Sequence, residues 1–523
     1  MSWRTTRAAA RLQQPGREVA VIDLGSNSWR LVVFTFVKGK WWKRTDELYE
    51  TVRIGAGMGA TGRLGDEAIA RGLETLTVFA RFCDSAGLAS SDVHAVATSA
   101  IRDATNGEQF VRSAREATGL PIEILSAEEE ARLGYVAAVN TSTLTDGAVL
   151  EIGGGSMQLV EVADRRAGAL ESLPLGAVRL TEELLPGPDP ARKKDLERVR
   201  AFVRDSLAGV GWLPRSGGRL VGIGGAVRNL AAAAQDAARL PFDIGVQGYV
   251  LEREALAELI QTLASQPVAE RGQLPGIKPG RGDIILAAAL AIEGVLELGG
   301  FDGIEATEAG LREGVFFDRE LLANGEPLFD DVRDAAVRNL AIQYESDLEH
   351  VAHVAQLSLQ MFDSLVEGGL IDPQAGERDL LWAASMLHDV GMTISYDDHH
   401  KHSRYLIVSA ELPGFDPRER ALIAQISRYH RKGAPKLGEM AAIARPGDEQ
   451  LIARCAVLLR LAEHLERGRD QSVRRVRLRA NGDGVDLHLD ADGDNLVLPR
   501  WSVERYGDGE AFERVFGRRL LIG

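Results

Sequence analysis

Two stretches of the sequence repeat one pattern, and this repeat limits the folds that the chain can adopt. AVIDLGSNSWRLVVF begins at Ala20, and AVLEIGGGSMQLVEV begins at Ala148. In each stretch an apolar run ends in an acidic residue, a turn of glycine, serine or asparagine follows, and a second apolar run comes next. Apolar runs on both sides of such a turn predict a β-hairpin. Two halves that open with the same hairpin predict a duplicated α/β domain with a cleft between its lobes.

The length and composition fit a soluble protein of several domains. A chain of 523 residues is too long for one hydrophobic core, so we expect three or four domains. Apolar residues make up 45% and charged residues 26%, as in ordinary globular proteins. The net charge of -15 predicts no binding to nucleic acid or to an anionic membrane. It is compatible with an anionic substrate, because a few arginines can dominate the charge inside a cleft.

The cysteines and the apolar segments predict a cytoplasmic protein. Cys83 and Cys455 are the only cysteines, which excludes a disulfide framework or a cysteine-based zinc site. The first residues, MSWRTTRAAARLQQPGREVA, lack the apolar centre of a signal peptide. No window approaches the roughly 18 uninterrupted apolar residues of a membrane span.

Several further elements can be predicted between and after the hairpins. Helical periodicity predicts a helix over Asp66–Ala86. The run VHAVATSAIRDA predicts a strand that carries Arg102 at its end, and IEILSAEEEARLGYVAAV predicts a strand followed by a helix. The second half contains GRLVGIGGAVRNLAAAA and ends near TEAGLREGVFFDREL.

The composition changes beyond about residue 320. Eight of the ten histidines lie between His350 and His464, in sequence of mostly helical period. The last part alternates apolar and polar residues around NGDG and DADGD, which predicts a small β-hairpin module. The predicted domains are two α/β lobes (1–140 and 141–318), a helical domain (319–472) and a small α+β tail (473–523).

The hairpin turns have the composition of phosphate-binding loops. Small residues allow several backbone N–H groups to point at one place, which suits phosphate oxygens. Gly153, Gly154 and Gly155 permit close approach of the backbone, and Ser28 and Ser156 add hydroxyl donors. A single such motif is equally compatible with a plain tight hairpin, but two copies in one register favour a shared phosphate site.

The acidic residue before each turn needs a separate explanation. Asp23 and Glu151 would repel a phosphate unless each holds a cation or orients a water molecule. We therefore predict that each lobe supplies one phosphate-binding loop to a shared cleft, with these two carboxylates as partners for a metal or for water.

This layout resembles the actin/Hsp70/sugar-kinase superfamily. Seven motifs also stand in the order typical of the exopolyphosphatase/guanosine pentaphosphate phosphatase family: VIDLGSNS, ATSAIRDATN, ILSAEEEARLGY, LEIGGGSMQLVE, LPLGAVRL, GIGGAVRNLA and EAGLREGV. The resemblance implies an α/β fold of duplicated ribonuclease-H-like (actin-like ATPase) lobes. It further implies an all-α HD-like domain after the lobes, with a small C-terminal β-rich module.

The run Glu128-Glu129-Glu130 contains the predicted catalytic base. Ser126 followed by Glu129 forms a capping box, which gives Glu129 a structural role at a helix start. Glu130 is freer to face the cleft, and the family motif implies that it is the base that activates water. The alternative is a solvated acidic helix face. Asp23 and Glu151 are the other predicted catalytic residues, and the same two would bind the metal.

The predicted substrate-binding residues are the two turns and three arginines. The family places a phosphate-binding arginine at Arg102, and Arg179 and Arg228 are further candidates that could donate to phosphate in pairs of hydrogen bonds. The alternative for each is an ordinary surface arginine. The turn residues are Gly25, Ser26, Asn27, Ser28, Gly153, Gly154, Gly155 and Ser156.

Two positions depart from the family pattern. Glu151 stands where the family usually has Asp, which lengthens the arm of the carboxylate by one methylene. Gln158 stands where the family usually has Glu, which removes a carboxylate that would help to hold a divalent ion. These departures leave open an inactive member that senses its ligand.

The histidine-rich region resembles HD-domain phosphohydrolases. That pattern implies a metal held by His350, His388, Asp389 and Glu463, with Glu463 in place of the usual Asp. His399, His402 and His430 could supplement these ligands. The alternative is a helical domain for dimerisation or substrate channelling, with ordinary histidines.

Together, these observations predict an exopolyphosphatase that releases terminal orthophosphate from inorganic polyphosphate with Mg²⁺ or another divalent cation. The first alternative is a guanosine pentaphosphate phosphohydrolase acting through the same site. The second is a polyphosphate or alarmone sensor, and a kinase is disfavoured by the SAEEEAR helix. The resemblance also implies a homodimer.

Overall fold

The computed structural model describes residues 16–187, 189–240, 244–322, 325–491, 496–506 and 508–522. The chain divides into two compact units: Met1–Ala238 with Val246–Val332, and Arg239–Gly245 with Arg333–Gly523. The residues on which the signal-peptide prediction rests lie largely outside the described residues, as does most of the DADGD segment.

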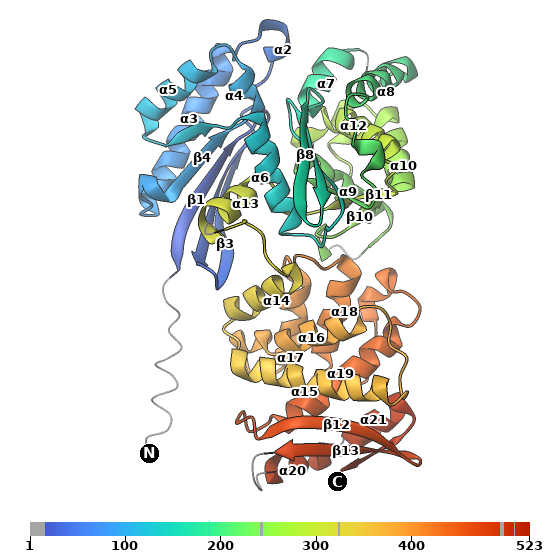
Figure 1. Ribbon diagram of the computed structural model, residues 1–523. Helices are drawn as coiled ribbons and strands as arrows, with labels where there is room; N and C mark the ends of the chain where they lie inside the picture. Colours follow the sequence, from blue (N-terminus) through green and yellow to red (C-terminus); the bar gives the residue numbers. More distant parts are fainter. Residues whose placement is uncertain are drawn as a thin grey trace. The chain divides into compact units, whose positions relative to one another are not determined.

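The first lobe of the N-terminal unit is built on a five-stranded sheet in the order β3-β2-β1-β4-β5 (Figure 1). Its strands are β1 (Arg17–Leu24), β2 (Trp29–Val37), β3 (Trp41–Glu50), β4 (Val93–Ala97) and β5 (Ile122–Ile124). β1 pairs antiparallel with β2 and parallel with β4. The first predicted hairpin is therefore β1–β2.

The second lobe repeats this arrangement. Its strands are β6 (Gly147–Ile152), β7 (Met157–Ala163), β8 (Arg166–Leu173), β9 (Arg219–Ile223), β10 (Val250–Glu252) and β11 (Gly303–Ala306). From β8 the order is β8-β7-β6-β9-β11, and β10 is added at the edge. The hairpin β6–β7 thus occupies the same position in the second sheet that β1–β2 occupies in the first sheet, as the repeated sequence predicts.

Helices cover both sheets, and one of them packs in a core that the two lobes share. The main helices of the unit are α2 (Met58–Thr61), α3 (Asp66–Ser85), α4 (Ser99–Asp103), α5 (Gly107–Thr118), α6 (Ala127–Val139), α7 (Ala177–Leu184), α8 (Lys193–Leu207), α9 (Gly225–Ala237), α10 (Arg253–Ser265), α11 (Val268–Arg271), α12 (Ile285–Gly299) and α13 (Leu311–Phe316). Val136 of α6 lies in one hydrophobic cluster with Val21 of β1 and Val149 of β6. The two hairpins are consequently held in fixed positions on either side of α6.

The helix predicted over Asp66–Ala86 and the strand–helix pair β5–α6 are confirmed. The strand predicted to carry Arg102 at its end is shorter than expected. β4 stops at Ala97, where its pairing with β5 also ends, and α4 follows because the N–H groups of Ile101 and Arg102 donate to the Thr98 carbonyl. Arg102 therefore lies on a short helix after the strand.

The C-terminal unit contains six principal helices and a small sheet around one core. The helices are α14 (Val332–Gln343), α15 (Leu348–Glu367), α16 (Glu377–Leu387), α17 (His399–Ser409), α18 (Pro417–Arg428) and α19 (Asp448–Leu465), followed by the shorter α20 (Val497–Arg505) and α21 (Asp508–Phe516). The sheet has the order β12 (Val473–Asn481), β13 (Gly484–Ala491), β14 (Arg519–Ile522). The hairpin predicted at NGDG is β12–β13, and its inward residues join the same hydrophobic cluster as the helices.

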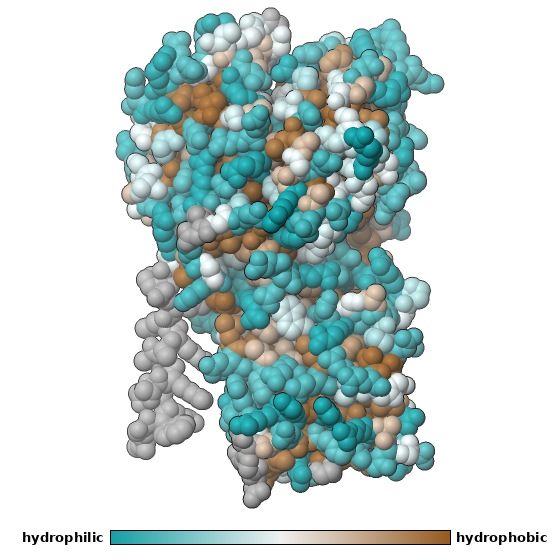
Figure 2. Space-filling model, in the orientation of Figure 1, coloured by the Kyte–Doolittle hydropathy of each residue, from teal (hydrophilic) through white to brown (hydrophobic). Residues whose placement is uncertain are grey.

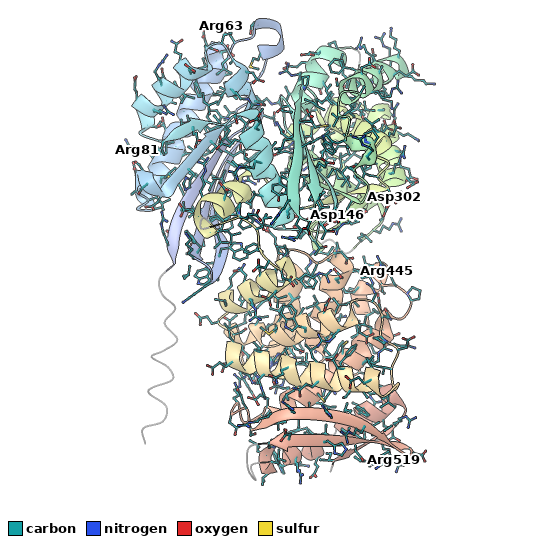
Figure 3. All side chains as sticks on the ribbon, viewed as in Figure 1. Arg63, Arg81, Asp146, Asp302, Arg445 and Arg519 are labelled. Carbon is teal, nitrogen blue, oxygen red and sulfur yellow. The ribbon has the colours of Figure 1, made fainter. Side chains whose placement is uncertain are left out.

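The surface of each unit is mainly hydrophilic on the face shown in Figure 2, with small scattered apolar areas. Charged side chains such as Arg81, Asp302 and Arg519 point outward from their units (Figure 3). Among the described residues, no helix has the length and apolar character needed to cross a bilayer.

Candidate active site

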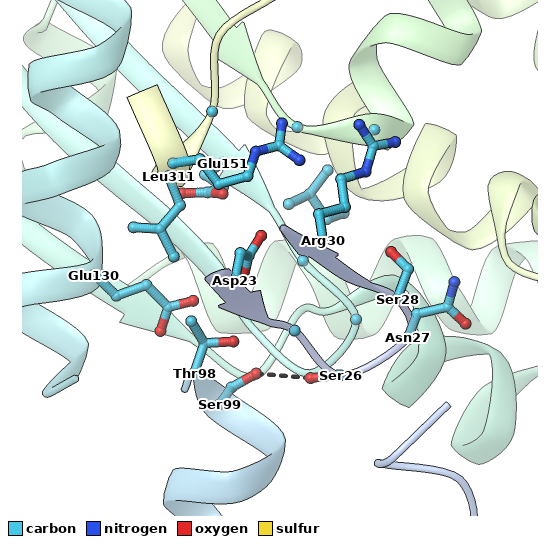
Figure 4. A pocket seen from close by; sticks show the side chains of 18 of the residues that line it. Asp23, Ser26, Asn27, Ser28, Arg30, Thr98, Ser99, Glu130, Glu151 and Leu311 are labelled. Atoms are coloured by element: carbon cyan, nitrogen blue, oxygen red, sulfur yellow. Dashed lines mark hydrogen bonds between the residues drawn. The ribbon is translucent and has the colours of Figure 1, made fainter. Parts of the chain in front are cut away.

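A cleft of about 110 Å³ lies between the two lobes of the N-terminal unit, at the turns of both hairpins. Figure 4 shows it from close by, with Asp23 between Glu130 and Arg30 in this view. The lining residues are Asp23, Gly25, Ser26, Asn27, Ser28, Arg30, Thr98, Ser99, Glu130, Glu151, Ile152, Gly153, Gly154, Gly224, Gly225, Arg228, Arg281, Ile284, Gly310, Leu311 and Arg312. Both predicted turns and all three predicted catalytic carboxylates meet in this cleft.

The two turns touch, and only glycine fits at the contact. A Cβ atom on Gly154 would lie 2.8 Å from Cβ of Ser26, and one on Gly155 would lie 2.7 Å from Oγ of Ser99. Ser26 and Ser99 are themselves hydrogen bonded through their hydroxyl groups at 3.0 Å. The glycines therefore allow the loop of the second lobe to approach the loop of the first.

Three carboxylates face the cleft from separate elements. Burial raises the pKa of Asp23, although Arg312 and Arg30 oppose the shift. Burial, followed by the charges of Glu130 and Asp23, raises the pKa of Glu151 to about 8. Oε2 of Glu151 has no hydrogen-bond partner among the described residues. A buried, unpaired carboxylate of this kind binds either a proton or a cation.

The longer arm of Glu151 fits because α6 carries a glycine beside it. A Cβ atom on Gly134 would lie 2.8 Å from Oε2 of Glu151. The carboxylate thus fills space that any other residue at position 134 would need. Gly134 was not predicted to belong to the site.

One half of the predicted capping box forms at the start of α6, and Glu130 faces the cleft as predicted. Ser126 caps α6 by accepting a hydrogen bond from the Glu129 N–H at 3.1 Å, and the side chain of Glu128 is exposed. Glu130 is buried, and its Oε2 accepts from Nη1 of Arg102 at 2.6 Å. Burial raises the pKa of Glu130, although the hydrogen bond from Arg102 opposes the shift.

Four arginines line the cleft, and one of them, Arg228, was predicted from the sequence. Arg228 is there, with Nη1 donating to the carbonyls of Glu308 and Ala309. Burial and the charge of Arg312 lower its pKa to about 10. The other three, which were missed, are Arg30, Arg281 and Arg312.

The sequence carried a signal for two of these three arginines. Arg30 follows Ser28 within the first hairpin and lies opposite Asp23 in the β1–β2 register. Arg312 stands within the motif EAGLREGV. Arg281, in a turn of proline and glycine, had no comparable signal. Its guanidinium lies against Gly225, where a Cβ atom would come within 2.2 Å of it.

Two predicted arginines do not line the cleft itself. Arg102 contacts Glu130 and Asp103 instead. Arg179 lines an adjoining pocket of about 230 Å³ together with Gly155, and its Nε donates to the Gly155 carbonyl at 3.0 Å. Both residues therefore contact parts of the site and hold them in place.

The two remaining residues of the second hairpin form a polar pair beside the cleft. Ser156 and Gln158 are both buried, and Nε2 of Gln158 donates to Oγ of Ser156 at 2.8 Å. Gln158 lies opposite Glu151 in the β6–β7 register. A carboxylate at position 158 would therefore share a face of the sheet with Glu151.

A second cluster of ionisable residues lies in the C-terminal unit. The predicted ligands His350, His388, Asp389 and Glu463 come together there. His399 and His430 join Asp389 in a second group. Among the described residues, His402 belongs to neither group.

Comparison with known proteins places this geometry in a family. The model of the Ppx/GppA phosphatase family matches residues 32–323, and that of Ppx/GppA phosphatase, domain III, matches residues 332–498. A guanosine-5'-triphosphate,3'-diphosphate pyrophosphatase of Vibrio vulnificus (strain YJ016) is 27% identical over 482 residues, which cover 90% of this chain and 92% of the relative.

Solved structures agree with this assignment. The Aquifex aeolicus member of the Ppx/GppA family is 29% identical with a TM-score of 0.52, covering 60% of this chain and 100% of that one. An exopolyphosphatase from Cytophaga hutchinsonii, 22% identical with a TM-score of 0.55, covers the same share of each chain and shares the fold. Because the first family model spans more than half of the sequence, the resemblance is confirmed, and this chain belongs to the Ppx/GppA phosphatase family.

Proposed function

We propose that this protein is an exopolyphosphatase that releases orthophosphate from the end of inorganic polyphosphate. The observation that carries the proposal is the position of Glu130. Its buried carboxylate, fixed by Arg102 at 2.6 Å, faces a cleft lined by two glycine-rich turns and four arginines. Such a cleft combines a base for water with donors for phosphate oxygens.

Different residues of the cleft bind the phosphate and activate the water molecule. Backbone N–H groups of the two turns and the guanidinium groups of the cleft bind the terminal phosphate. Glu130 accepts a proton from a water molecule whose oxygen attacks the terminal phosphorus. The bridging P–O bond breaks, and the shortened polymer leaves as an anion stabilised by the arginines. Burial favours this role for Glu130, because it raises the pKa toward the working pH.

A divalent cation, such as Mg²⁺, fits the same cleft. Asp23 and the unpaired Oε2 of Glu151 offer the hard oxygen ligands that this ion prefers. When bound, the ion would offset the charge of these carboxylates and of the phosphate oxygens.

A guanosine pentaphosphate phosphohydrolase is the second candidate. The Vibrio vulnificus relative bears the name of such an enzyme and matches 90% of this chain. Both substrates end in a phosphoanhydride, so the same residues serve either reaction. A sensor with little turnover is the third candidate, because Gln158 leaves one carboxylate fewer beside Glu151.

The C-terminal unit supports an additional part of the proposal. We infer that its helices form an HD-like domain with a small β module, since histidines and carboxylates from five helical segments converge within it. The homodimer and the cytoplasmic location expected from the sequence remain predictions.

Phosphate release by the purified protein with Mg²⁺ tests the proposal, with long-chain polyphosphate and guanosine pentaphosphate offered side by side. Glu130→Gln should lower the rate by at least about 10²-fold, since it removes the base, while polyphosphate binding persists. Glu128→Gln, an exposed change on the same helix, is the control and should leave the rate unaltered.

The outcomes separate the candidates. Faster release from the nucleotide would move the assignment to the second candidate. Tight binding of either ligand without release would favour the sensor. A full rate in Glu130→Gln would remove this residue from the mechanism.

A further inference from the structure

The pocket beside the cleft has no part in the hydrolysis proposed above. Its volume is about 230 Å³, against about 110 Å³ for the cleft. Both lobes line it, with Met58 of α2 on one side and Val178 of α7 on the other. Ser26, Ser99 and Gly154 line the cleft as well as the pocket. A single layer of residues therefore separates the two spaces.

This layer consists of two serines of the first lobe and two glycines of the second. The hydroxyl groups of Ser26 and Ser99 are hydrogen bonded to each other at 3.0 Å. Gly154 and Gly155 lie so close to these serines that a Cβ atom would not fit. Among the described residues, no hydrogen bond joins the two lobes at this layer; the Gly154 carbonyl, for example, accepts from the Val178 N–H within its own lobe. Van der Waals contact of this small extent is lost at little cost when the turns part.

Two weak contacts close the pocket on its outer side. The Gly57 N–H donates to Oε1 of Glu182 at 3.3 Å. Nη2 of Arg179 lies 3.8 Å from Oδ2 of Asp103. Each contact joins the first lobe to the second, and both carboxylates belong to exposed residues. Because exposed pairs of this kind contribute little stability, the pocket can open to solvent on this side.

Positive charge lies at a different edge of the cleft. Arg30 lines the cleft, and its guanidinium lies 4.8 Å from the centre of the Tyr49 ring. Nζ of Lys278 lies 5.8 Å from the centre of the same ring. Tyr49 and Lys278 are exposed, so the cleft has cations where it faces solvent. This edge is suited to be the entrance for a polyanion.

The entrance and the serine layer lie on opposite sides of the site. Figure 4 shows Arg30 on one side of Asp23 and the hydrogen bond between Ser26 and Ser99 on the other. A polyphosphate that enters past the cations reaches the turns with its terminal phosphate first. After hydrolysis, the orthophosphate therefore lies between the turns and the shortened polymer. The polymer, still held by the cations, blocks the way back.

We propose that orthophosphate leaves through this second pocket while the polymer stays in the cleft. The proposal rests on the exopolyphosphatase function proposed above. A brief displacement of the β6–β7 turn, whose strands stay fixed by the core around α6, lets the product pass between the serine hydroxyls and the glycine backbone. The polymer can then advance by one phosphate without first dissociating.

The side chains of the pocket suit the passage of an anion more than its retention. The hydroxyl groups of Ser26 and Ser99 can donate to phosphate oxygens at the inner side, and the guanidinium of Arg179 lines the pocket. Asp103 and Glu182 also line it, and their carboxylates repel an anion. Like charge at the exposed side thus prevents the product from accumulating there.

Substitutions that fill the pocket from either lobe test the proposal. Met58→Trp adds a large side chain from the first lobe, and Val178→Phe does so from the second. Each protein is mixed with Mg²⁺ and long-chain polyphosphate. Acid quenching measures all the orthophosphate that has formed, and a fluorescent phosphate sensor measures the part that is free in solution. Val78→Phe, at an exposed position on α3, is the control.

Both filled variants should form the first orthophosphate at the rate of the unaltered chain. They should release it at least about 10-fold more slowly, because product release then limits turnover. Tripolyphosphate leaves only pyrophosphate, which can depart through the entrance and clear the way back, so the loss with this substrate should be less than about 2-fold. Met58→Ala widens the pocket and should not slow release.

Three results would overturn the exit. The first is release from the filled variants as fast as from the control, and the second is an equal loss with tripolyphosphate and with the long polymer. The third is slower formation of orthophosphate in both filled variants, because the substitutions would then act on the chemical step. An unaltered chain that forms no orthophosphate at all would instead remove the proposed function, and the exit with it.

Discussion

At the level of single residues, the cleft brings three carboxyl groups together at the place where phosphate would bind. Burial raises the pKa values of Asp23, Glu130 and Glu151, and neighbouring carboxylates of the cleft add to the shift for Glu130 and Glu151. The folded protein therefore holds protons on these groups at pH values where the unfolded chain has released them. A bound cation can take the place of those protons.

The raised pKa of Glu151 predicts how the free energy of unfolding depends on pH. The pKa of Glu151 is about 8 in the folded chain and 4.5 in its usual state. Without a divalent cation, the free energy of unfolding should fall as pH rises from about 4.5 to about 8. The slope approaches about 1.4 kcal/mol per pH unit for one proton.

Thermal unfolding of the metal-free chain at several pH values measures this effect. Glu151→Gln should flatten part of the decline, because the amide carries no charge, and Mg²⁺ should restore stability to the unaltered chain at pH 8. Stability that rises with pH over this interval, and does so equally in Glu151→Gln, would contradict the prediction.

Gln158 gives a second prediction at this scale. Gln158→Glu should place another carboxylate on the face of the sheet that holds Glu151, and so raise the affinity for Mg²⁺ or the rate of phosphate release. Its contact with Ser156 can persist, with the hydroxyl donating to the new carboxylate. A Mg²⁺ titration of phosphate release compares the two proteins, and identical curves would show that position 158 has no influence on the metal.

At the level of elements, the site depends on close contact between the two hairpin turns. The contact is possible because the second turn has glycine, with no side chain, where the turns meet. Gly155→Ala would bring a methyl group 2.7 Å from Oγ of Ser99 and force the β6–β7 turn away from the first lobe. A displacement of about 1 Å at a phosphate site can cost about 10²-fold in rate. We expect such a loss of kcat/KM for polyphosphate.

Gly153→Ala is a matched comparison, because a Cβ atom there would have only the Ser156 carbonyl oxygen within 4 Å, at 3.5 Å. It should lose much less activity. Ser99→Ala combined with Gly155→Ala should recover part of the loss, since the clashing oxygen is gone. Equal losses in the two glycine variants would mean that the contact between the turns is unimportant.

At the level of the whole molecule, the proposed hydrolysis belongs to the N-terminal unit alone. That unit contains both sheets and its own hydrophobic clusters. The Aquifex aeolicus relative matches 60% of this chain over its entire length. A compact unit with its own core can fold by itself.

A fragment of residues 16–332 should therefore fold and release phosphate. We expect cooperative thermal unfolding by circular dichroism and activity that Glu130→Gln abolishes. A fragment that melts without a transition, or that is inactive while folded, would show that the C-terminal unit completes the site.

The sequence alone determined much of this protein, because its strongest signals are local. The repeated hairpins predicted two lobes and a shared cleft, and the Ser126 cap left Glu130 as the glutamate free to face inward. Periodicity predicted α3 to within one residue of its end, and the Ser126 cap predicted the start of α6. Such features depend on backbone geometry over a few neighbouring positions, so a short stretch of sequence is enough to specify them.

Tertiary structure decided which distant side chains meet. Arg281 and Arg312 reach the cleft from the second half of the chain, whereas Arg102, which the family motif favoured, holds Glu130. Gly134 makes room for Glu151 only because α6 packs against β6. These contacts join positions far apart in sequence, and the packing of helices on sheets, which no local pattern records, brings them together.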